Sequence, residues 1–149
     1  MTITIKALER CHKETEETLA VEKSEFLKQK LDYLKMHQEE FLYAESDDFT
    51  SLKMDAVVLE FDEMFQVYTA LFGLRLQKKV NAQLKAYLRE NLKGMLGSSS
   101  AMFSGDEGMW EINIALDAME GFTGEETIEQ AYELLTGFVK GLLHELDAE

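Results

Sequence analysis

The chain has no proline in 149 residues, and this absence constrains its fold more than any other feature. Proline fixes φ and lacks a backbone N–H, so it ends helices and marks loops. Average usage is about 5%. A chain without it is expected to consist of helices joined by few turns, with glycine and serine at the boundaries. The absence of proline therefore predicts an all-α protein.

Apolar residues three and four positions apart support this prediction. The segment 50–72 is apolar over most of its helical circumference, which is typical of a helix at the centre of a bundle. In the first segment the spacing is disturbed at 20–24, so that it is one kinked helix or two. We expect an antiparallel bundle of four or five helices in a single domain spanning 1–149, with a mobile loop at about 97–108. The predicted helices are 5–44, 50–72, 74–95 and 124–147.

The stretch 109–122 fits two patterns. Trp110, Ile112 and Ile114 alternate as in a strand, whereas Met109 and Met119 belong to a set with helical spacing. A helix is favoured because helices are expected on both sides. The alternative is a small two-stranded element from 1–5 and 110–116, and two strands alone are marginally stable.

Charge indicates what the chain binds. The formal net charge is −14, and residues 101–149 carry twelve acidic residues against a single base, Lys140. Phosphate backbones and anionic membranes would be repelled, which argues against nucleic acid and membrane surfaces as partners, whereas a basic protein would be attracted. The predicted partner-binding residues are an acidic helical stripe and two acids in the preceding loop: Glu125, Glu129, Glu133, Asp106 and Glu107.

The sequence shows no catalytic or metal-binding constellation. Of the three histidines only His12 has a glutamate three residues before it, Glu9, whereas a di-iron bundle needs a Glu-x-x-His pair on each of two helices. Zinc bound through Cys11 and His12 would lack two further ligands at a recognisable spacing, and Cys11 is better interpreted as a core cysteine. Asp55 is expected to face solvent or to pair with Arg75 or Lys79. We therefore predict no catalytic residue, no metal and no cofactor.

The cysteine count and the N-terminal sequence indicate the cellular compartment. A single cysteine cannot form an intramolecular disulfide, which favours a reducing environment. Neither a signal peptide nor an apolar run of membrane-spanning length is evident. The expected localisation is cytoplasmic.

Two functions remain after these exclusions. The leading hypothesis is a non-catalytic regulatory or protein-interaction protein that binds a basic partner through its acidic C-terminal third. The alternative is a sensor or carrier for a small apolar ligand, such as a fatty acid, in the bundle interior. A homodimer through the N-terminal helix is a further expectation. The residues that would line the interior site are Met54, Phe61, Met64, Phe65 and Tyr68.

Overall fold

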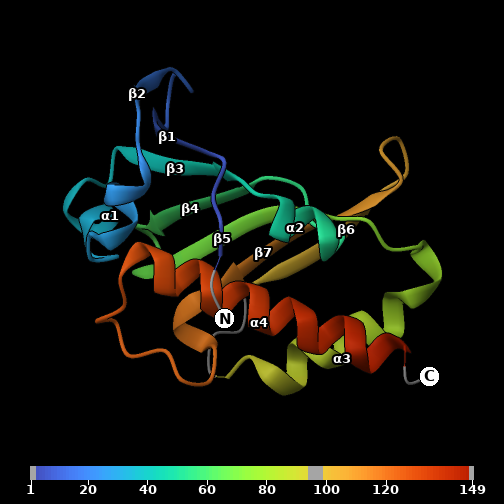
Figure 1. Cartoon of the computed structure of the whole chain (residues 1–149). Helices are drawn as coiled ribbons and strands as arrows, with labels where there is room; N and C mark the ends of the chain where they lie inside the picture. Colours follow the sequence, from blue (N-terminus) through green and yellow to red (C-terminus); the bar gives the residue numbers. More distant parts are fainter. Residues whose placement is uncertain (1–2, 94–98, 148–149) are drawn as a thin grey trace.

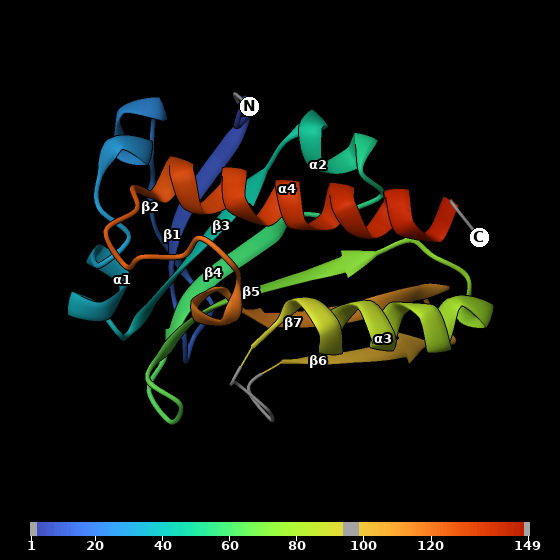
Figure 2. The ribbon, with the colours of Figure 1, turned by 90° about the horizontal axis from the view of Figure 1, so that it is seen from below.

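The computed structural model describes residues 3–93 and 99–147, and it contradicts the expected all-α bundle. One layer is a seven-stranded antiparallel sheet in the order β2-β1-β3-β4-β5-β7-β6 (Figure 1). Helices form the second layer, on one face of that sheet (Figure 2). The strands are β1 (Ala7–His12), β2 (Thr18–Val21), β3 (Glu40–Glu45), β4 (Val57–Asp62), β5 (Val67–Leu74), β6 (Ser100–Ser104) and β7 (Met109–Ala115).

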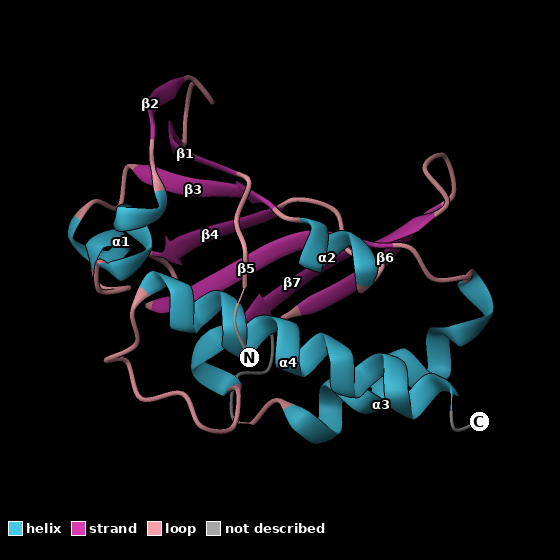
Figure 3. Ribbon diagram, viewed as in Figure 1, coloured by secondary structure: helices cyan, strands magenta, loops and turns pink. Residues whose placement is uncertain are grey.

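Most of the helical elements are much shorter than the sequence analysis predicts (Figure 3). Only the last has the length expected of a bundle helix, and it runs across the sheet. Three 3₁₀ turns join the strands to the α-helices. The α-helices are α1 (Tyr33–Met36), α2 (Asp47–Ser51), α3 (Asn81–Asn91) and α4 (Ile128–Asp147), and the 3₁₀ turns are η1 (Ser24–Lys28), η2 (Lys78–Val80) and η3 (Leu116–Ala118).

The expected central helix 50–72 is mainly the hairpin β4–β5. In β4 burial alternates with a period of two, so that Val57, Leu59 and Phe61 are buried and the residues between them are half-buried. The turn that follows contains neither glycine nor proline. Its geometry comes from the Asp62 carboxylate, which accepts the amides of Met64 and Phe65 at 2.8 and 3.0 Å. The sequence of two apolar strands joined by such a turn has the same pattern of apolar residues as a helix that is apolar on all sides.

The N-terminal prediction is wrong for a similar reason. The segment 5–44 forms β1, β2, η1, α1 and β3, so the helix on which the homodimer expectation depends does not exist. Its turns again use residues other than proline, such as Glu16, whose φ is 62°. The absence of proline therefore does not imply a helical chain.

The C-terminal half agrees with the sequence analysis only in its helices. Residues 81–91 and 128–147 are helical as expected, but the first turn of the predicted 124–147 helix is not. The ambiguous stretch 109–122 begins as strand β7, which pairs with β5 and β6 and not with residues 3–5, the described part of 1–5. Of the loop predicted at 97–108, residues 97 and 98 lie outside the described part and 100–104 form β6. Its mobility stays a prediction.

A single large core lies between the sheet and the helices. It extends from Ile3 to Leu142, with a small satellite beside η3. The ring of Phe49 on α2 lies 5.7 Å from that of Tyr132 on α4, which ties the two helices together. In the described ranges, no second layer of helices covers the opposite face of the sheet, which we call the open face (Figures 1 and 2), although Val67 and Ala115 at one end of it are buried against Ala118 of η3. One register row crosses this face on all seven strands: Val21, Glu9, Tyr43, Val58, Leu71, Asn113 and Ser100.

Candidate functional site

The structure divides the five predicted partner-binding acids into two groups. Glu129 and Glu133 lie on α4, and Glu125 precedes it, whereas Asp106 and Glu107 occupy the turn between β6 and β7. The two places lie at opposite ends of the molecule (Figures 1 and 2). They do not form one acidic surface.

The start of α4 explains why Glu125 is separated from the helix. The Thr123 hydroxyl accepts the Glu125 amide at 3.1 Å, and the Glu126 carboxylate accepts the Thr123 amide at 2.8 Å, as expected of a capping box. This box closes a turn, however, and a second reciprocal pair between Thr127 and Gln130 caps the helix itself. Glu125 therefore points out before the helix begins, within 4.0 Å of the Lys30 ammonium.

The five residues expected to line an interior ligand site are also separated. Met54, Phe61 and Tyr68 are buried in the core, where the rings of Phe61 and Tyr68 meet edge to face with centroids 5.1 Å apart. Met64 and Phe65 are 84% and 45% exposed at the β4–β5 turn. The described residues do not bring the five to one cavity, and the apolar-ligand alternative stays a prediction that no observation favours.

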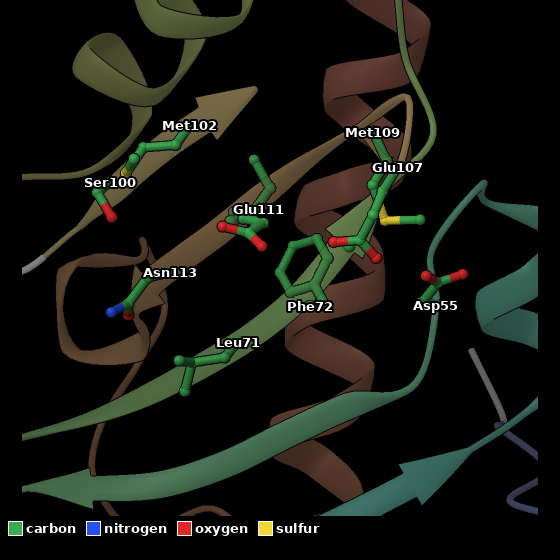
Figure 4. Close-up of a pocket in the computed structure, with 11 residues that line it drawn as sticks. Asp55, Leu71, Phe72, Ser100, Met102, Glu107, Met109, Glu111 and Asn113 are labelled. Atoms are coloured by element: carbon green, nitrogen blue, oxygen red, sulfur yellow. The ribbon is translucent and has the colours of Figure 1, made fainter. Parts of the chain in front are cut away.

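The open face contains a different candidate, a trough of about 460 Å³ over β5, β7 and β6. Figure 4 shows Asp55 and Glu107 together at one end, and Ser100 and Met102 toward the other. Apolar side chains and three carboxylates share its wall. The lining residues are Asp55, Leu71, Phe72, Gly73, Ser100, Met102, Glu107, Met109, Glu111, Ile112 and Asn113.

Local sequence explains the shape of this trough. Gly73 on β5 pairs with Glu111 on β7, and the missing side chain leaves room for Met109 to lie across the strand. A Cβ atom at position 73 would come within 2.5 Å of the Met109 sulfur and 3.0 Å of an Asp55 carboxylate oxygen. A side chain at position 73 would therefore force Met109 to move, and Met109 forms an adaptable apolar wall.

The trough has acceptors in excess of donors. Asp55 forms an ion pair with Arg75, as the sequence analysis allows. Within residues 3–93 and 99–147, Glu107 and Glu111 have no ion-pair partner, and the buried Oδ1 of Asn113 has no hydrogen-bond donor. A buried acceptor without a partner costs about 1–3 kcal/mol. A ligand that brings N–H donors and positive charge would satisfy all three groups.

The comparisons with known proteins add nothing to this geometry. No protein-family model, curated protein or solved structure matches the chain. The site alone must therefore indicate the function.

The chemically reactive side chains near the trough are few. Its described lining contains one serine and three carboxylates but no histidine, cysteine or lysine. Cys11 lies buried on β1, away from the trough lining, and burial raises the pKa of its thiol. The described residues contain no group of three or more His, Cys, Asp or Glu placed to hold a metal ion. None of the helices in this part of the chain has the length and apolarity to cross a bilayer.

Sequence reasoning names one trough residue in its binding prediction, Glu107, and misses the others. The available signal is the alternation along β7, which puts Met109, Glu111 and Asn113 on one side and Trp110, Ile112 and Ile114 on the other. A strand interpretation of 109–115 identifies Glu111 as exposed. Asp55 and Gly73 could not be found in this way, because they reach the trough through pairing between distant segments.

Proposed function

We propose that the chain is a non-catalytic protein-interaction domain that binds a basic partner protein over the trough of its open face. The observation that carries this proposal is the combination of unpaired Glu107 and Glu111 carboxylates with an apolar wall formed by Leu71, Met102 and Met109. Met102 is 65% exposed. An exposed apolar surface bordered by charge is typical of a protein-binding site.

The charge of the whole chain supports the same type of partner. At −14 it attracts basic proteins over a distance, which increases their association rate and makes binding sensitive to salt. Contact with the trough then adds two shorter-range contributions. Lysine or arginine donors meet the free carboxylates and the Asn113 oxygen, and apolar side chains bury the exposed thioether of Met102.

Two doubly neutralised variants test where binding occurs. Glu107→Gln with Glu111→Gln removes the trough carboxylates, and Glu129→Gln with Glu133→Gln removes the same number of charges from α4. The probe is a fluorescent ten-residue peptide of alternating lysine and valine, with a glutamate–valine peptide as its control, measured by anisotropy at low and high salt. We expect the trough variant to weaken lysine-peptide binding by about tenfold and the α4 variant to change it by less than about twofold.

The outcomes separate the two acidic surfaces. Weakening by the α4 variant alone would transfer the interface to the helical stripe of the sequence prediction. Equal binding of the two peptides, or binding that salt does not affect, would contradict a basic partner altogether.

A further inference from the structure

The structure assigns the recognition mode of this partner, given the proposed function: an extended segment of the partner binds as an eighth strand along the outer edge of β6. Strand addition uses the unpaired backbone N–H and C=O groups of an edge for affinity, and neighbouring pockets for specificity. The edge of β6 and the adjoining trough supply both.

The outer edge of β6 lacks the usual protection of an edge strand. Natural proteins place lysine, proline or a bulge on such edges to prevent further pairing. Strand β6 has the sequence Ser-Ala-Met-Phe-Ser, without charge or proline, and its register with β7 is unbroken over all five pairs. Among the described residues no strand pairs with its outer side. In the described part of the chain, the outer edge of β6 is therefore an unprotected edge.

The opposite edge of the sheet is a useful contrast. Strand β2 has only four residues, and Glu17 and Glu22 flank it directly. Its pairing with β1 is interrupted by a register shift between Arg10 and Cys11. Short length, flanking charge and a bulge are the devices that discourage strand addition. The chain therefore protects one edge of its sheet and leaves the other available.

The two sides of β6 define the side chains that an added strand should carry. Ser100 and Met102 line the trough on the open face, whereas Ala101 and Phe103 are partly buried against the core. Met102 pairs with Glu111, so a residue added opposite Met102 lies two strand spacings from Glu111, about 9.6 Å. A lysine or arginine there can reach the Glu111 carboxylate. Its neighbours in the added strand, on the other side, would cover Phe103.

The occupant is therefore a partner segment in which basic and apolar residues alternate. A second copy of this chain is a poorer fit, because each copy carries a net charge of −14 and like charges at an interface oppose association.

The experiment compares two peptides on the wild-type protein. One is the lysine–valine peptide, and the other has the same side chains with every backbone nitrogen methylated, which removes its hydrogen-bond donors but keeps its charge. We expect methylation to weaken binding by more than about tenfold. Hydrogen exchange should show the amides of Ser100–Ser104 becoming protected by the unmethylated peptide, while the amides of β2 do not change.

Each of the other possible outcomes would contradict strand addition, the proposed function or the basic character of the bound segment. Equal binding of the two peptides without protection of β6 would overturn strand addition and leave the proposed function intact. No binding of either peptide would overturn both. A free protein that is already dimeric, with concentration-dependent protection of β6, would show that a second copy occupies the edge and would overturn the assignment of a basic segment.

Discussion

Two tyrosine hydroxyls show how differently single polar groups contribute to this fold. Tyr132 is fully buried in the core, and the described residues offer its hydroxyl no partner. The hydroxyl of Tyr33 instead donates to Glu40 and accepts from Arg10, each at 3.0 Å. Arg10 also binds Glu22 at 2.7 Å, so Tyr33 belongs to a network that joins β1 to β3 and the segment before η1.

Removing each hydroxyl should therefore have opposite effects. Tyr132→Phe is expected to raise the free energy of unfolding by about 1 kcal/mol, because a buried group without a hydrogen bond opposes folding. Tyr33→Phe, the matched control, should lower it by a similar amount. Urea titrations of the two variants beside wild type measure both. Destabilisation by Tyr132→Phe would show that its hydroxyl has a partner after all.

At the scale of elements, the turn before α4 makes stability depend on pH. Burial opposes ionisation of Glu126, but hydrogen bonds from the amides of Thr123 and Gly124 outweigh it and lower the pKa of the carboxyl. The ionised group is thus favoured in the folded state. It stabilises the protein above the ordinary pKa of 4.5, and this contribution disappears as the pH falls through the lowered native value.

Glu126→Gln should remove this dependence. We expect the variant to be less stable than wild type at pH 7, and the difference to shrink as the pH is lowered from about 6 to about 3. Thermal unfolding across this range is the measurement, with the exposed Lys28→Ala change as a control whose profile should run parallel to wild type. A difference that is constant with pH would exclude Glu126 as the titrating group.

Which elements the sequence predicts depends on how many of their faces are buried. The helix α4 has one apolar stripe and is readily recognised. Strand β5 is buried on both faces along Val67–Ala70, so its apolar residues do not alternate with a period of two. Lys53 and Gln66 adopt positive φ values, and the turns at these positions therefore have no glycine by which the sequence could indicate them. The trough is harder still, because Gly73 and Glu111 meet only through a strand register that local patterns do not define.

At the scale of the molecule, the exposed bases around α3 are separated from the acids of α4 and of the trough. The surface around α3 exposes five bases, Lys78, Lys79, Lys85, Arg89 and Lys93. No ion pair among the described residues joins them to Glu125, Glu129 or Glu133. The unpaired trough acids lie on the other side of the sheet.

The shared core predicts that the whole molecule unfolds as one unit. Leu8 on β1, Trp110 on β7 and Leu142 near the end of α4 belong to the same cluster, so no strand or helix can leave without exposing apolar surface of the others. Trp110 is the only tryptophan and is 2% exposed. Its fluorescence reports on β7, whereas far-UV circular dichroism reports on all elements. We expect both to give the same midpoint in urea. An earlier fluorescence transition would mean that the β6–β7 hairpin opens separately.

This outcome also bears on strand addition, which requires β6 to be ordered before the partner arrives. If β6 had to fold on binding, the free-energy cost of ordering it would weaken the affinity.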